Sequence, residues 1–139
     1  MLEALIALFE CACEERWLGH ARELADEIIA RFADGERGGF FATASDGEEL
    51  IVRRKELEDT PIPSGASSAA LGLLRLAQIT GEDSYERHAL SVLRLEHEIA
   101  VRHPTGFGAL LQALHHYLAP ARPIACTLPS GARVGATRG

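Results

Sequence analysis

The fold is indicated by two stretches that align without a gap, MLEALIALFECACEERWLGHARELA at residues 1–25 and AALGLLRLAQITGEDSYERHALSVL at residues 69–93. The second stretch repeats the first at a distance of 68 positions, so that apolar residues fall on apolar residues. Matched pairs are Leu5 with Leu73, Ile6 with Leu74, Leu8 with Leu76, Trp17 with Tyr85, His20 with His88, Ala21 with Ala89 and Leu24 with Val92. Self-similarity at a fixed period is typical of repeat architectures.

Each repeat unit has the pattern of a helical hairpin. Residues 2–12 and 65–79 are apolar on most sides, which predicts buried helices, whereas residues 17–32 and 84–101 are amphipathic. The predicted buried face of the later amphipathic helix consists of Tyr85, Ala89, Val92, Leu93, Ile99 and Ala100. A fifth helix at residues 106–118 is expected to be the first half of a third hairpin. Because such units bury their faces only against neighbours, we expect an uncovered apolar face. Through this face the chain would associate with itself or with the rest of a larger array.

Residues 38–68 form the only long interval without helical periodicity between the two helical halves, and binding groups often lie on such connections. The segments at residues 40–43 and 50–52, on either side of a turn at residues 46–47, predict a small β-hairpin there. Ser64 is the expected N-cap of the helix that follows. The sequence therefore predicts an all-α fold of about five helices with a small β-hairpin in the central loop.

Composition excludes several classes of function. The chain has 139 residues and a formal net charge of −6, which argues against a nucleic-acid partner, since such partners require a basic face. No apolar run reaches the length that spans a bilayer, so no membrane partner is expected. Cys11, Cys13 and Cys126 lack the spacing of a zinc site, and we interpret them as small buried residues of a cytoplasmic protein. Without a phosphate loop or a metal-spaced cluster, neither a cofactor nor a metal is expected.

Several motifs, in order, resemble a known family. They are GGFF at residues 38–41, the Arg53, Lys55, Asp59 series followed by PSG at residues 63–65, and HPTGFGALLQAL at residues 103–114. Together they resemble the C-terminal part of the thioredoxin-domain-containing proteins related to bacterial YyaL and spermatogenesis-associated protein 20. The resemblance covers roughly residues 1–125.

This resemblance implies an (α/α) toroid of six helical hairpins, similar to six-hairpin glycosidases and N-acylglucosamine 2-epimerases. The chain is then a partial toroid, with a helical domain at residues 1–119 and an irregular tail at residues 120–139. We expect a fragment without independent activity. One alternative is part of a carbohydrate-acting enzyme that another chain completes, with a carbohydrate as ligand. A second alternative is a helical-repeat module that binds protein.

A glycoside-cleaving site needs two carboxylates, one of them a proton donor. Asp59 and Glu56 are the catalytic candidates, with Arg53 or Lys55 positioned to keep Asp59 ionised. For Asp59 the alternative is a carboxylate that ties the loop to a helix N-terminus.

Four residues are candidates for substrate binding: Arg53, Lys55, Ser64 and Phe41. Phe41 can stack on a sugar ring or, alternatively, pin the loop to the core. For Ser64, which precedes a glycine without a paired base, a helix cap is the simpler interpretation.

Overall fold

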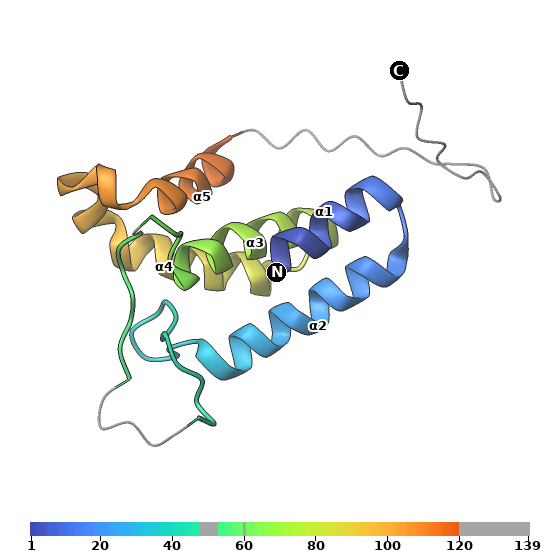
Figure 1. Cartoon of the computed structure of the whole chain (residues 1–139), viewed down its shortest axis with the longest axis horizontal. Helices are drawn as coiled ribbons and strands as arrows, with labels where there is room; N and C mark the ends of the chain where they lie inside the picture. The colour runs from blue at the N-terminus through green and yellow to red at the C-terminus, as the bar shows by residue number, and fades with distance from the viewer. Residues whose placement is uncertain (48–52, 60, 120–139) are drawn as a thin grey trace.

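The computed structural model describes residues 1–47, 53–59 and 61–119, and this part of the chain is helical (Figure 1). The elements are α1 (Leu2–Ala12), α2 (Glu15–Phe32), α3 (Gly65–Thr80), α4 (Asp83–Arg102), the 3-10 turn η1 (Pro104–Gly106) and α5 (Gly108–Leu118). The prediction of an all-α fold with about five helices is confirmed for the described residues.

The repeat is visible in the ends of the helices. Helix α1 ends at Ala12 and α3 at Thr80, while α2 begins at Glu15 and α4 at Asp83, each pair 68 positions apart. The residues that follow α1 and α3 are also equivalent: Cys13 and Gly81 both adopt the left-handed conformation, with φ of 54° and 73°. Each of these residues donates its amide to the carbonyl four residues earlier, which closes the helix end. The two predicted hairpins are therefore α1–α2 and α3–α4.

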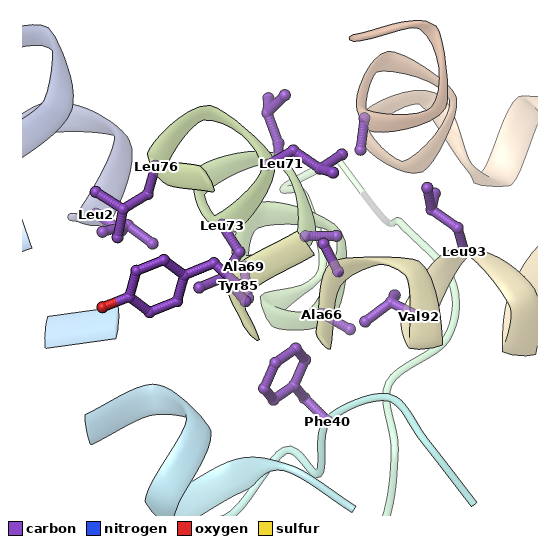
Figure 2. Packing of buried hydrophobic residues seen from close by; sticks show 14 of the residues in the cluster. Leu2, Phe40, Ala66, Ala69, Leu71, Leu73, Leu76, Tyr85, Val92 and Leu93 are labelled. Carbon is purple, nitrogen blue, oxygen red and sulfur yellow. The ribbon is translucent and has the colours of Figure 1, made fainter. Parts of the chain in front are cut away.

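Helix α3 is the centre of the core, packed against α1, α4 and α5 (Figure 1). Figure 2 shows the side chains that converge on it, with Leu2 of α1 on one side and Leu93 of α4 on another. The buried residues of α3 are Ala66, Ser67, Ala69, Ala70, Leu71, Gly72, Leu73, Leu74, Leu76 and Ala77. Each fully buried Leu contributes about 1.5–3 kcal/mol relative to an exposed one, so α3 organises the fold.

Helix α1 is less buried than its sequence predicts. Only Leu2 and Ile6 are buried, and Leu8, the repeat equivalent of the buried Leu76, is exposed. The reason is position, because α1 packs against α2 and α3 and lies at one side of α3 (Figure 1). The expectation that residues 2–12 are buried on several sides is therefore wrong.

The described part of the predicted β-hairpin is not a strand. Phe40 forms an isolated antiparallel bridge with Ala33, and the amide of Phe41 donates to the carbonyl of Phe32. Gly38 and Gly39, both with φ of 75°, reverse the chain after α2, so the segment pairs with the end of that helix. The second predicted strand, residues 50–52, and the tail at residues 120–139 lie outside the described residues.

Cys11 and Cys13 are exposed, contrary to expectation, while Cys126 lies outside the described residues. Cys13 occupies the left-handed position directly after the end of α1. Within the part of the chain that the structure describes, no helix has both the length and the apolar run needed to cross a bilayer.

Candidate functional site

A pocket of about 300 Å³ lies where both hairpins meet the central loop. The first turns of α1 and α3 and the second half of α2 form its walls, and residues 40–42 with Glu56 complete it. Its lining residues are Met1, Leu2, Glu3, Leu24, Ile28, Phe32, Phe40, Phe41, Ala42, Glu56, Gly65, Ala66, Ser68 and Ala69. Phe40 is buried, and Figure 2 shows its ring directed towards Ala66 of α3. The lining is mostly apolar and aromatic, with carboxylates from Glu3 and Glu56, which is the usual composition of a small-molecule site.

Two of the predicted site residues, Phe41 and Glu56, line this pocket together. Glu56 is exposed and also borders a shallower groove along residues 55–58 and 62–64. A carboxylate beside an aromatic face can bind a hydroxyl or a cation while the ring contacts an apolar surface. The assignment of Glu56 as a catalytic acid stays a prediction.

Arg53 and Lys55 lie against the ring of Phe41. The guanidinium carbon of Arg53 is 4.1 Å from the ring centre, and Lys55 Nζ is 5.2 Å from it. Arg53 also donates to the backbone carbonyls of Thr43 and, at 3.1 Å, Arg31. These contacts hold the loop and use both cations as cation–π partners of Phe41.

Lys55 forms its ion pair with Asp34, at 2.7 Å, and also donates to the carbonyl of Gly38. The pair is shielded from solvent, with side chains 16% and 10% exposed respectively. The hydrogen bond from Lys55, followed by the amide of Arg37, lowers the pKa of Asp34 to about 2. The expectation that Arg53 or Lys55 would hold Asp59 ionised is therefore wrong, because Lys55 binds a different carboxylate and Arg53 binds backbone carbonyls.

Asp59 joins the N-termini of two helices. Its Oδ1 accepts from the amide of Ser64 at 2.8 Å, and its Oδ2 accepts from the amides of Ala109 at 2.8 Å and Leu110 at 3.3 Å. Burial raises the pKa of Asp59, but hydrogen bonds from Ser64, the Ser67 side chain and α5 outweigh it and leave the pKa below its ordinary value. This is the alternative that the sequence suggested, a carboxylate tied to helix N-termini, while the catalytic assignment stays a prediction.

Ser64 caps α3 as predicted. Its Oγ accepts from the amide of Ser67 at 3.0 Å and donates to the Ser67 hydroxyl at 2.9 Å. The residue is buried and its hydroxyl serves the helix end, although it also borders the groove along residues 55–58 and 62–64. The assignment of Ser64 to substrate binding stays a prediction. Among the described residues, no group of three His, Cys, Asp or Glu side chains is placed to hold a metal ion.

Glu96 of α4 is a buried carboxyl group that the sequence analysis missed. It lies four residues after Val92 and four before Ala100, within the buried stripe of the helix, while Ile99, predicted to face the core, is exposed. Burial, then the charge of Asp59, raises the pKa of Glu96 to about 8, against a lowering effect of Lys55. Its position on the apolar stripe was the signal that could have revealed it. The sequence analysis instead assumed that charged residues face solvent.

Over 115 residues, the chain is 30% identical to spermatogenesis-associated protein 20 of Rattus norvegicus and to that of Homo sapiens, covering 82% of this chain and 15% of each relative. An uncharacterized protein of Caenorhabditis elegans is 27% identical over 117 residues, which cover 84% of this chain and 16% of that protein. The chain is a homologue of one part of spermatogenesis-associated protein 20. Neither a protein-family model nor a solved structure matches the chain.

The chain thus spans about 15% of the length of the spermatogenesis-associated protein 20 relatives that it matches. The motif resemblance is confirmed as homology to this part of spermatogenesis-associated protein 20. The toroid stays a prediction.

Proposed function

We propose that this chain supplies helical hairpins to a larger array of the (α/α) toroid type, resembling six-hairpin glycosidases and N-acylglucosamine 2-epimerases, and has no activity of its own. The repeat of helix ends 68 positions apart, with left-handed residues at Cys13 and Gly81, carries the proposal. Homology to 15% of a much longer protein supports it. Repeat units gain stability by stacking on neighbours, so a short series is a component of a larger assembly.

Apolar side chains at the outer sides of α4 and α5 support the same proposal. Val101 is 78% exposed and Leu118 69% exposed, and Leu111 and Tyr117 of α5 are exposed as well. Helix α5 contacts α3 and the end of α4, but no described helix pairs with it as α2 pairs with α1. An additional helix against α5 would cover part of this surface.

The test is the oligomeric state of the isolated chain. Light scattering during size exclusion should show self-association that increases with concentration, because the apolar surface lacks its natural neighbour. A variant with Val101→Ser and Leu118→Ser should shift towards monomer. Gln112→Ser, at an exposed polar position of α5, is the matched control and should behave as wild type. A wild-type chain that is monomeric at all concentrations and unfolds cooperatively contradicts the proposal.

A carbohydrate is the second candidate, as the ligand of the pocket within the completed array. The observation that favours it is the placement of Phe41 and Glu56 on one pocket, an aromatic surface beside a carboxylate. Amide NMR spectra recorded with monosaccharides and disaccharides test it, because Ala42, Gly65 and Ala66 report on the lining. Shifts that Glu56→Gln removes support a sugar site, and spectra unchanged by every sugar contradict it.

A further inference from the structure

Glu96 is a buried acid that the fold leaves without a full set of partners. Its side chain is 1% exposed, and its Oε2 has no hydrogen-bond partner within the described part of the chain. Burying an ionised carboxylate without partners costs much solvation free energy, whereas burying the protonated form costs much less. In this structure Glu96 is therefore protonated, consistent with the rise of its pKa to about 8.

Among the described residues, the charged groups that act on the pKa of Glu96 are Asp59 and Lys55, both from the segment at residues 53–59. Asp59 disfavours the ionised form of Glu96, but its own oxygens are held by the amides of Ser64, Ala109 and Leu110. Lys55 favours the ionised form. Lys55 is thus the described cation that lowers the pKa of Glu96, and an ionised Glu96 would attract it.

Lys55 already holds the loop after α2 through Asp34 and the carbonyl of Gly38. The same loop is fastened to α4, because the amide of Gly39 donates to Ser91 Oγ at 3.0 Å. A Cβ at Gly39 would lie 2.8 Å from Leu95 Cδ2 and 4.0 Å from Lys55 Nζ. The ammonium group therefore lies close to the loop and to the residue that precedes Glu96.

We propose that Glu96 and Lys55 form a proton-controlled latch on the loop at residues 34–41. While Glu96 carries its proton, Lys55 binds Asp34 and Gly38 and keeps the loop closed against α4. When the Glu96 O–H bond breaks and the proton passes to solvent, the new carboxylate competes with Asp34 for Lys55. The loop then loosens, and Phe40 and Phe41 loosen with it. Since both aromatic residues line the pocket, the latch couples proton loss to access to that pocket.

Hydrogen exchange tests the latch directly, because the amides of Gly38, Gly39 and Phe41 are all hydrogen-bonded in the closed loop. Protection factors, which correct for intrinsic exchange, would be compared between pH 6 and pH 9. At pH 9, one unit above a pKa of about 8, ionised Glu96 outnumbers the neutral form about tenfold. In the wild type, the protection factors of these loop amides should fall roughly tenfold between pH 6 and pH 9.

Glu96→Gln keeps the shape of the side chain but cannot ionise, so its loop protection should not change with pH. Glu98→Gln, at an exposed position on the same helix, is the matched control and should follow the wild type. Equal loss of protection in the Glu96→Gln chain, or no loss in the wild type, overturns the latch. Should Glu96→Gln fail to fold, carboxyl-carbon NMR of the wild type decides: a Glu96 midpoint near 8 supports the latch, and one near 4.5 overturns it.

This inference does not depend on the proposed assembly. The latch concerns the loop of a single chain, whereas the assembly is read from the oligomeric state. A monomeric chain whose loop protection falls with pH would contradict only the proposed assembly. A self-associating chain whose loop protection does not change with pH would contradict only the latch.

Discussion

The carboxylate of Asp59 and the amide of Ser64 are joined by a hydrogen bond of 2.8 Å that closes the central loop onto the N-terminus of α3. The other oxygen of Asp59 accepts from two amides at the start of α5. Helix N-termini carry unpaired amides and a partial positive charge, so this one partly buried carboxylate satisfies both ends at once. Asp59 thereby fixes the N-terminus of α3 relative to the N-terminus of α5.

Replacement of Asp59 by Ala should destabilise the chain by roughly 2–4 kcal/mol, because it leaves backbone amides of two helices unsatisfied. Asp59→Asn should cost less, since the amide oxygen still accepts one of these bonds. Urea unfolding followed by circular dichroism measures both. Glu58→Ala, at the exposed neighbouring position, is the control and should change stability by no more than about 0.5 kcal/mol. Equal effects of Asp59→Ala and Glu58→Ala would show that the helix ends do not depend on this carboxylate.

The helices were predictable from sequence because the repeat and the apolar periodicity both depend on local side-chain spacing. The cap at Ser64 and the end of α3 at Gly81 followed from residue types with strong conformational preferences. Cys13 could not be predicted as a left-handed residue, since the preference at that position belongs to Gly and Asn. Only its alignment with Gly81 indicates it.

The site was less predictable because its contacts join residues far apart in sequence. The pairing of Lys55 with Asp34 depends on how the two glycines after α2 reverse the chain, and no local pattern states this. The burial of Glu96 depends on how the rest of the fold packs around α4. Such tertiary contacts override the rule that charged residues face solvent.

Gly72 of α3 lies close to Leu2 of α1. A Cβ there would lie 2.8 Å from Leu2 Cδ2 and 3.0 Å from Leu2 Cγ, so Gly72→Ala must displace a buried side chain. Overpacking of this kind costs about 1–3 kcal/mol, which exceeds the gain of roughly 1 kcal/mol from replacing a helical Gly by Ala. We expect net destabilisation, measured by the urea midpoint. Gly19→Ala, in α2 with nothing within 4 Å, should instead stabilise, and a stabilising Gly72→Ala would refute the close packing.

The Lys55–Asp34 pair makes the stability of the chain depend on acid pH. The pKa of Asp34 is about 2 in the folded chain against an ordinary value of 3.8, so the folded state favours the ionised form. Its contribution is complete above about pH 4 and is lost as the pH falls towards 2. Asp34→Asn should be less stable than wild type at pH 6, and the difference should shrink by pH 2. Thermal unfolding across this range measures it, and a difference independent of pH would contradict the pairing.

Cys13 offers a test of the repeat itself, because it adopts with φ of 54° the conformation that its equivalent Gly81 adopts with φ of 73°. A left-handed backbone costs a residue with a side chain about 1–2 kcal/mol, whereas Gly adopts it freely. Cys13→Gly, which places the residue of the second hairpin into the first, should therefore stabilise the chain by roughly 0.5–1 kcal/mol after the greater flexibility of unfolded Gly is counted. The reciprocal change, Gly81→Ala, should destabilise by about 1 kcal/mol. The urea midpoints of both variants measure these changes in stability. The two changes should have opposite signs, and two changes in the same direction would mean that the helix ends are not equivalent.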